Sequence, residues 1–228
     1  MLRKIIAIIP ASGIGTRMNI SLPKQYLELQ GKTILEHSLR PFLTHPDIHK
    51  IVVAISQADT FYSNLAILKS DKIQLVYGGE TRANSVLNAL KILENDAWVL
   101  VHDAARPCLK RSDVDKILQI DDPNGAILAT PVVDTMKRAN AQSQIVKTED
   151  RSTLWRALTP QFFNVGLLKK ALVLAFQNNE TVTDEASAME LLGYKPQLVE
   201  GRSDNLKITH PEDLALAEFY LAQEGINK

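Results

Sequence analysis

The chain has 228 residues, of which 45% are hydrophobic, and its 26 lysines and arginines are balanced by 26 aspartates and glutamates. This size and apolar content predict one large domain, residues 1–228, and the balanced charge argues against nucleic acid or a membrane surface as a partner. No apolar run approaches the ~20 residues that span a bilayer, and the single cysteine, Cys108, excludes an internal disulfide. Because the first residues enter a strand at once, we expect neither a signal peptide nor a transit peptide, and we expect a cytoplasmic protein.

The first expected element is an apolar strand over residues 5–9, which runs directly into a glycine-rich turn. This turn reads Pro10-Ala11-Ser12-Gly13-Ile14-Gly15-Thr16-Arg17-Met18, and Pro23-Lys24-Gln25 follows it. Such a turn is typical of a phosphate-binding sheet edge, because glycine lets backbone N–H groups approach an anion. Arg17 and Lys24 add two cations, so the segment predicts a polyphosphate site rather than only a tight turn. The spacing fits neither a Walker loop nor a dinucleotide fingerprint, whose third glycine position holds Met18.

Strand and helix patterns alternate along the rest of the chain. Strands are expected at residues 50–56, 73–77, 97–102, 126–131 and 197–200, and helices at 33–40, 82–93, 112–120 and 167–176. Pro41 is expected to end the first helix. Thr183 and Glu185 are expected at the capped start of another helix, and Thr209 is expected to cap a terminal helix that runs to about residue 222. Near-continuous apolar strands separated by helices predict an α/β fold with a mostly parallel, doubly wound sheet.

Residues 132–153 interrupt this alternation. Two polar, β-prone runs flank a turn-rich stretch at residues 139–143, which predicts a β-hairpin. A lone hairpin is marginal in water, so we expect this arm to pack on the same arm of a second subunit in a symmetric dimer. The alternative is a solvated flap or lid.

A carboxylate follows the expected strand at residues 97–102. Asp103 should lie at the carboxyl end of this strand, at the same sheet edge as the glycine-rich turn. A single carboxylate beside a polyphosphate is a common way to hold Mg²⁺, which also takes phosphate oxygens and waters as ligands. The alternative roles for Asp103 are a helix N-cap or an ion pair with Arg106.

Two further segments could contact a nucleotide. Gly78-Gly79 follows the strand at residues 73–77, and Ser85 lies a few residues on. Glycine permits close approach of a flat base and a serine hydroxyl can hydrogen-bond it, although a turn and helix start explain the same residues. Lys207 could be a third phosphate-binding cation or a solvated lysine.

These motifs together resemble one known family over nearly the whole chain. The resemblance is carried by Pro10–Met18 with Pro23-Lys24-Gln25-Tyr26, Gly78-Gly79 with Arg82 and Ser85, Val101–Pro107, Asp134-Thr135-Met136-Lys137, Leu158-Thr159-Pro160-Gln161, Thr183–Ser187, Glu200-Gly201-Arg202 and Asp204–Thr209. The family is 2-C-methyl-D-erythritol 4-phosphate cytidylyltransferase, an enzyme of non-mevalonate isoprenoid synthesis. The resemblance implies a Rossmann-like nucleotidyltransferase fold, a homodimer formed by a protruding β-arm, and a divalent metal such as Mg²⁺. It also implies transfer of CMP from CTP to methylerythritol phosphate with release of pyrophosphate.

The resemblance implies a role for each matching residue. The cytidine would be held by Ala11, Ser12, Gly13, Gly15, Gly79, Glu80 and Ser85. The phosphates would be bound by Arg17, Lys24 and Lys207, which are the expected catalytic residues, and Asp103 would bind the metal. The acceptor would contact Arg106, Thr159 and Thr183, together with Thr135 and Arg151 from the partner's arm. Ser12 stands where the family often has alanine, and Glu80 stands where it often has aspartate.

Three alternatives follow from the same residues. The nearest is a cytidylyltransferase for another polyol phosphate, such as ribitol 5-phosphate, because related families share the first loop. A metal-dependent glycosyltransferase would need an Asp-x-Asp pair, whereas Asp103 stands alone and Asp121-Asp122 precedes Pro123. A non-catalytic nucleotide-binding module would not need Arg17, Lys24, Asp103 and Lys207 together.

Overall fold

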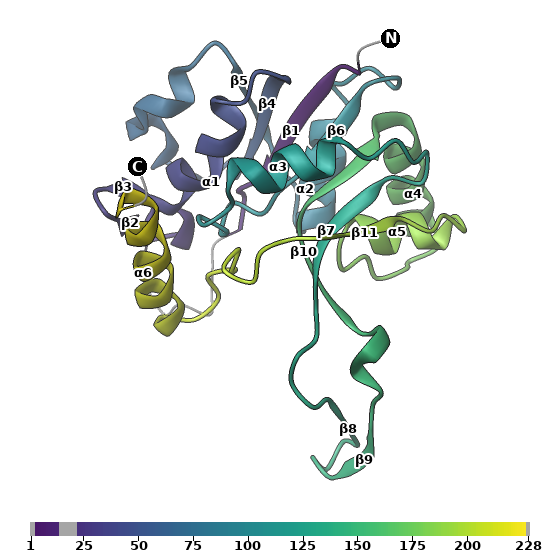
Figure 1. Cartoon of the computed structure of the whole chain (residues 1–228). Coiled ribbons are helices and arrows are strands. Elements are labelled where there is room, and N and C mark those ends of the chain that lie inside the picture. The colour runs from purple at the N-terminus through teal and green to yellow at the C-terminus, as the bar shows by residue number, and fades with distance from the viewer. Residues whose placement is uncertain (1–2, 14–21, 227–228) are drawn as a thin grey trace.

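The computed structural model describes residues 3–13 and 22–226, with side chains to residue 223. Its central feature is a seven-stranded sheet in the order β11-β7-β10-β6-β1-β4-β5 (Figure 1). The strands of this sheet are β1 (Ile5–Pro10), β4 (Ile48–Ile55), β5 (Ile73–Tyr77), β6 (Trp98–Val101), β7 (Ala126–Pro131), β10 (Trp155–Asn164) and β11 (Gln197–Glu200). β1 pairs in parallel with β4 and β6, β4 with β5, and β11 with β7. The expected mostly parallel α/β sheet is therefore confirmed.

Six α-helices are present in the described part of the chain. They are α1 (Ile34–Leu43), α2 (Arg82–Leu90), α3 (Arg111–Leu118), α4 (Val165–Gln177), α5 (Glu185–Leu191) and α6 (Glu212–Ile226). None of the helices described is long and apolar enough to cross a membrane. A small two-stranded sheet, β2 (Glu28–Leu29) and β3 (Lys32–Thr33), contacts α6.

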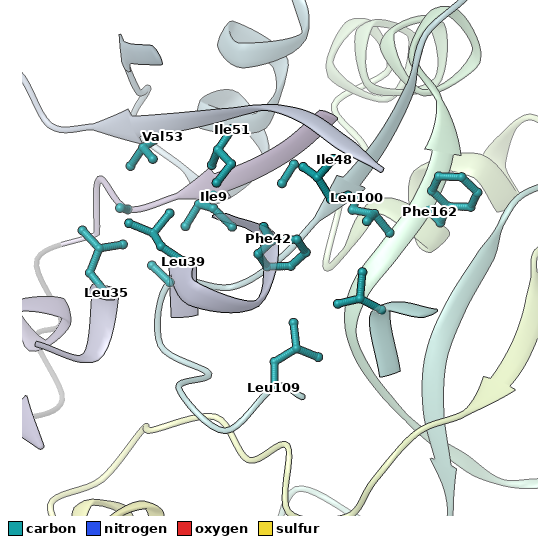
Figure 2. Packing of buried hydrophobic residues seen from close by; sticks show 14 of the residues in the cluster. Ile9, Leu35, Leu39, Phe42, Ile48, Ile51, Val53, Leu100, Leu109 and Phe162 are labelled. Carbon is teal, nitrogen blue, oxygen red and sulfur yellow. The ribbon is translucent and has the colours of Figure 1, made fainter. Parts of the chain in front are cut away.

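Alternate residues of the strands face two separate apolar cores. On β1, Ile9 belongs to the core that includes α1 and α3, and Ile8 belongs to the core that includes α2, α4 and α5. Figure 2 shows the first core, where Phe42 and Leu39 of α1 lie against the strands. Helices thus cover both faces of the sheet, as the near-continuous apolar strands predict.

One central strand was not expected from the sequence. β10 lies between β6 and β7 and runs antiparallel to both. Its register with β7 shifts between Ala157 and Gln161, on either side of Pro160. A proline inside the run argues against a central strand, because proline cannot donate a ladder hydrogen bond. The register shift at this position accommodates the proline.

The expectation that Pro41 ends the first helix is wrong. α1 continues through Pro41 to Leu43, and Phe42 is fully buried. The helix starts with a capping box in which Thr33 and Glu36 satisfy each other's backbone N–H groups. At the other end, the Lys72 ammonium donates to the carbonyl oxygens of Phe42, Leu43 and His45. Burial of Phe42 and these contacts outweigh the local preference of proline.

Two helix starts also differ from expectation. The N-cap of α5 is Asp184 rather than Thr183, because the Asp184 side chain accepts from the Ser187 N–H. α6 begins at Glu212, and the Asp213 carboxylate accepts the N–H groups of Thr209 and His210. The carboxylate of Asp213, rather than that of Glu212, therefore satisfies the backbone before this helix.

The expected hairpin in residues 132–153 is confirmed. β8 (Lys137–Ala139) pairs antiparallel with β9 (Ile145–Thr148), and the Asn140 side chain accepts two N–H groups in the turn between them. This arm projects away from the main sheet (Figure 1). Its apolar side chains Val133, Ile145 and Val146 are exposed.

Candidate active site

The segments that follow β1, β5 and β6 meet at one edge of the sheet. Because these strands run in parallel within the sheet, their carboxyl ends lie at that edge, where open α/β sheets bind ligands. A cavity of about 160 Å³ lies there. Its lining includes Ala11, Ser12, Gly13, Lys24, Glu80, Arg82, Asp103 and Lys207.

The two glycines after β5 allow a close approach between the turns. A Cβ on Gly78 would lie 2.7 Å from the Ser12 Cβ, and one on Gly79 would lie 2.5 Å from the Asn84 Cβ. The hydroxyls of Ser12 and Ser85 are 2.7 Å apart, and the Gly79 N–H donates to Ser85 Oγ at 3.0 Å. The sequence therefore requires glycine here so that the first loop and the start of α2 can pack together.

Lys24 reaches the same cavity from a short 3₁₀ turn, Lys24–Tyr26. Its ammonium donates to the carbonyl oxygen of Ile208 at 3.0 Å. The neighbouring Gln25 is buried and donates to the Ala11 carbonyl oxygen at 2.8 Å. These bonds connect the Lys24 turn with the first loop and with the segment that carries Lys207.

Three cationic side chains converge on Asp103. Arg82 Nε lies 2.7 Å from Oδ1, while Lys207 Nζ and Arg106 Nε lie 3.0 and 3.3 Å from Oδ2. Burial by itself raises the pKa of Asp103, but the charges of Arg82, Lys207 and Arg106 outweigh it and hold that pKa well below its ordinary value. The carboxylate is therefore ionised at neutral pH.

Arg82 links Asp103 to a second buried carboxylate. Its two terminal nitrogens lie 2.7 and 3.0 Å from the two oxygens of Glu185, whose side chain is only 1% exposed. Burial lowers the pKa of Arg82, but the charges of Glu185 and Asp103 outweigh it and raise that pKa above its ordinary value. Arg82 is a permanent cation that bridges two anions.

A hydrogen-bonded chain fixes the backbone around Asp103. The Arg106 carbonyl oxygen can only accept, so His102 Nε2, which lies 3.2 Å from it, carries the proton of the neutral ring. His102 Nδ1 therefore accepts from the Thr159 hydroxyl at 2.9 Å, and Thr159 Oγ1 accepts the Asp103 N–H at 3.1 Å. Burial lowers the pKa of His102 to about 4 despite the nearby Asp103 charge, so this ring is neutral at pH 7.

A second cavity, of about 270 Å³, also borders Asp103. It is lined by Arg82, Asp103, Arg106, Ala157, Leu158, Thr159, Gln161, Thr183, Asp184 and Lys207. Arg82, Asp103 and Lys207 line both cavities. Two ligands bound in these cavities would therefore meet at the same three charged groups.

The structure brings most of the predicted site residues together. The first cavity is lined by Ala11, Ser12, Gly13, Lys24, Glu80, Asp103 and Lys207, and Gly79 and Ser85 lie beside it. The second cavity is lined by Arg106, Thr159 and Thr183. The Thr159 hydroxyl is already engaged by Asp103 and His102. Thr135 and Arg151 are exposed on the arm and line neither cavity. Gly15 and Arg17 lie outside the described residues.

Two charged residues of the site were not assigned a role from the sequence. Arg82 is the first residue of α2, three positions after Gly79, and Glu185 is the first residue of α5. They are 103 positions apart in the chain, so no local spacing connects them. The sequence feature that could have indicated Arg82 is an arginine at the first position of a helix that follows a glycine-rich turn.

The donor set at Asp103 is small. The described residues contain no group of three or more His, Cys, Asp or Glu side chains that could hold a metal ion. A single carboxylate fits an ion such as Mg²⁺, whose other ligands are phosphate oxygens and waters. Asp103 therefore fits a metal ion that also binds a phosphate ligand. Binding of this ion would replace at least one of the ion pairs that Asp103 makes with Arg82, Arg106 and Lys207.

A mostly parallel sheet with two cation-lined cavities at its carboxyl edge is the arrangement of an α/β nucleotidyltransferase. The family model for 2-C-methyl-D-erythritol 4-phosphate cytidylyltransferase matches residues 5–223, and the chain belongs to this family.

Curated relatives and solved structures agree with this assignment. A 2-C-methyl-D-erythritol 4-phosphate cytidylyltransferase of Actinobacillus pleuropneumoniae serotype 7 is 70% identical over 98% of both chains. One from Haemophilus influenzae is 60% identical over 99% of this chain and 100% of the relative. The crystal structure of the Francisella tularensis enzyme has a TM-score of 0.82 at 41% identity, covering 95% of this chain and 99% of that one. The Thermus thermophilus structure has a TM-score of 0.78 at 29% identity, covering 95% and 98%.

Proposed function

We propose that this chain transfers CMP from CTP to 2-C-methyl-D-erythritol 4-phosphate in non-mevalonate isoprenoid synthesis. The products are 4-diphosphocytidyl-2-C-methyl-D-erythritol and pyrophosphate. The observation that carries the proposal is the pair of cavities that share Arg82, Asp103 and Lys207. A nucleotide in one cavity and a phosphorylated acceptor in the other would place both reacting phosphates beside these groups.

The reaction requires positioning more than proton transfer. An oxygen of the acceptor phosphate attacks the α-phosphorus of CTP, and the bond from that phosphorus to the β-phosphate oxygen breaks. Pyrophosphate leaves with the bonding electron pair. Because the acceptor phosphate is already ionised at pH 7, no general base is required. The protein must bring two anions together and stabilise the developing charge.

Cations from several segments supply this stabilisation. We infer that Lys24, Lys207 and Arg17 bind the triphosphate and the leaving pyrophosphate. Asp103 would hold Mg²⁺ or another divalent cation, which neutralises phosphate charge and helps to orient the phosphates when bound. Lys207 contacts Asp103 at 3.0 Å, so a small movement of its ammonium would transfer this contact to a phosphate.

The cytidine would lie between the first loop and the turn after β5. We infer that Ala11, Ser12, Gly13, Gly15, Gly79, Glu80 and Ser85 form this part of the site. The contact between the Ser12 and Ser85 hydroxyls supports the proposal, because it holds the two segments side by side at the cavity. Glu80 is exposed at the cavity rim, where its carboxylate could accept a hydrogen bond from a ribose hydroxyl.

The acceptor would occupy the second cavity. Arg106 and Thr183 would contact methylerythritol phosphate, with Thr159 nearby. Thr135 and Arg151 line neither cavity of their own chain and lie on the projecting arm (Figure 1), which supports a homodimer in which each arm reaches the partner's acceptor. We further infer one domain, residues 1–228, that carries the arm at residues 132–153, and a cytoplasmic location.

Pyrophosphate release with CTP tests this function when only the acceptor is varied. We expect release with 2-C-methyl-D-erythritol 4-phosphate and little with ribitol 5-phosphate. Preference for ribitol 5-phosphate would assign the chain to another polyol phosphate. Absence of release with either acceptor, from protein that still binds CTP, would indicate a binding module without catalysis.

A further inference from the structure

We propose that Glu185 is a positioning residue for the transfer site and that it acts on Asp103 through Arg82. The inference rests on the proposed role of Asp103 in holding the nucleotide's divalent cation. Glu185 itself lines neither cavity, so its effect must pass through the arginine.

The geometry makes Arg82 a rigid bridge. Its terminal nitrogens bind both oxygens of Glu185, while its Nε binds Asp103 Oδ1 at 2.7 Å. A two-point contact between a guanidinium and a carboxylate fixes the plane of the arginine as well as its position. Glu185 therefore determines which edge of Arg82 faces Asp103.

Glu185 is held firmly at the start of α5. Its neighbour Asp184 caps the helix and accepts from Gln161 Nε2 at 2.9 Å, while Gln161 Oε1 accepts the Ala186 N–H at 2.9 Å. Gln161 belongs to β10 and is itself buried. The wall of the acceptor cavity thus supports the residue that orients Arg82.

The charges give Glu185 a second effect on Asp103. Arg82, Arg106 and Lys207 surround Asp103, and among the described residues Glu185 is a second carboxylate that pairs with one of these cations, Arg82. Without the Glu185 charge, Arg82 would interact with Asp103 alone. Its full charge would then compete with a divalent cation for the Asp103 oxygens.

The experiment uses a matched pair of variants on α5. Glu185→Gln removes the buried charge with little change in volume, and Glu190→Gln removes an exposed charge from the same helix. Binding of Mn²⁺ in the presence of CTP, without acceptor, is followed by the electron paramagnetic resonance of free Mn²⁺. Steady-state kinetics and thermal unfolding are measured alongside.

We expect Glu185→Gln to weaken Mn²⁺ binding by roughly 10–100-fold, as is common for the partners of metal ligands. Its kcat should fall at ordinary Mg²⁺ concentrations and recover partly at high Mg²⁺, whereas Glu190→Gln should match the parent protein. Glu185→Asp, which keeps the charge but shortens the side chain, should lie between the parent and Glu185→Gln.

A double variant tests whether the effect passes through Asp103. Adding Glu185→Gln to Asp103→Asn should weaken Mn²⁺ binding no further than Asp103→Asn does alone. Independent, additive losses would overturn the inference, as would folded Glu185→Gln protein with unchanged Mn²⁺ binding. If Glu185→Gln does not fold, parent-like Mn²⁺ binding by Glu185→Asp would overturn it. If Asp103→Asn itself binds Mn²⁺ and CTP normally, the proposed metal site fails instead.

Discussion

Lys24 and Lys207 line the first cavity with Asp103, and Arg17 belongs to the same glycine-rich segment in the sequence. The cationic side chains at the site were mostly identifiable from the sequence, because their residue types and neighbours along the chain were enough to nominate them. The Arg82–Glu185 pair was not predictable in this way, because each member is an ordinary charged helix residue until folding brings them together.

The first prediction concerns the cations that bind phosphate. Lys24→Ala and Arg17→Ala should each lower kcat/KM by roughly 10²–10³-fold, because each removes a charge that stabilises the transition state. Circular dichroism and thermal unfolding should show folded protein. Near-normal kcat/KM in both variants would contradict the mechanism.

The second prediction follows from the neutral, buried His102. Its pKa is lowered to about 4 in the folded protein, against an ordinary value of about 6.5 in an unfolded chain. The unfolded state therefore binds the extra proton first as the pH falls. Stability should be fully present above about pH 6.5 and decline toward pH 4, by an amount on the order of 3 kcal/mol.

Denaturant unfolding at several pH values between 7 and 4 measures this decline. The imidazole resonances of His102 identify its source, since this ring should remain neutral until the pH approaches 4. Titration of His102 near pH 6.5 in the folded protein would refute the prediction.

Among the elements, helix α1 and strand β10 depart most from local sequence preference. Each contains a proline that argues for an interruption, and each continues because the neighbouring structure supplies burial or hydrogen bonds. Strands β1, β4, β6 and β7 were predictable because they contain near-continuous apolar runs with no internal proline. The hairpin was predictable from its two β-prone runs and the turn-forming residues between them.

The third prediction tests the support at the end of α1. Lys72→Met retains an apolar stem but removes donors to three carbonyl oxygens, of which the His45 oxygen is the nearest at 2.8 Å. The free energy of unfolding should fall by about 1–2 kcal/mol. Denaturant unfolding measures it, with Lys69→Met as the control because Lys69 is exposed. Equal effects of the two substitutions would show that these bonds contribute nothing.

The fourth prediction concerns the arm. Arg151→Ala should raise KM for methylerythritol phosphate more than KM for CTP, because we place Arg151 against the partner's acceptor. Direct CTP binding by calorimetry should be unchanged. An equal loss for both substrates would show that the arm does not act on the acceptor.

At the scale of the whole molecule, the projecting arm predicts that each active site of the proposed homodimer is completed by the partner subunit. If arms act between subunits, Lys24→Ala and Arg151→Ala subunits should complement each other when they are mixed, allowed to exchange and assayed at a low acceptor concentration, where each variant alone has little activity. Half of the dimers would be mixed, each with one intact site, so activity should return to about a quarter of the parent value. Sedimentation should show dimers throughout, and failure of exchanged dimers to regain activity would place the arm's action within its own chain.

The sequence was sufficient to predict the class of fold, the hairpin, the family and most residues at the cavities. These depend on apolar periodicity, glycine turns and charged motifs, which are local and can be read along the chain. The order of β10 in the sheet, the sharing of three charged groups between the cavities and the Glu185–Arg82–Asp103 bridge required the folded chain. Each depends on contacts between distant segments, and such contacts form only when the strands are assembled side by side.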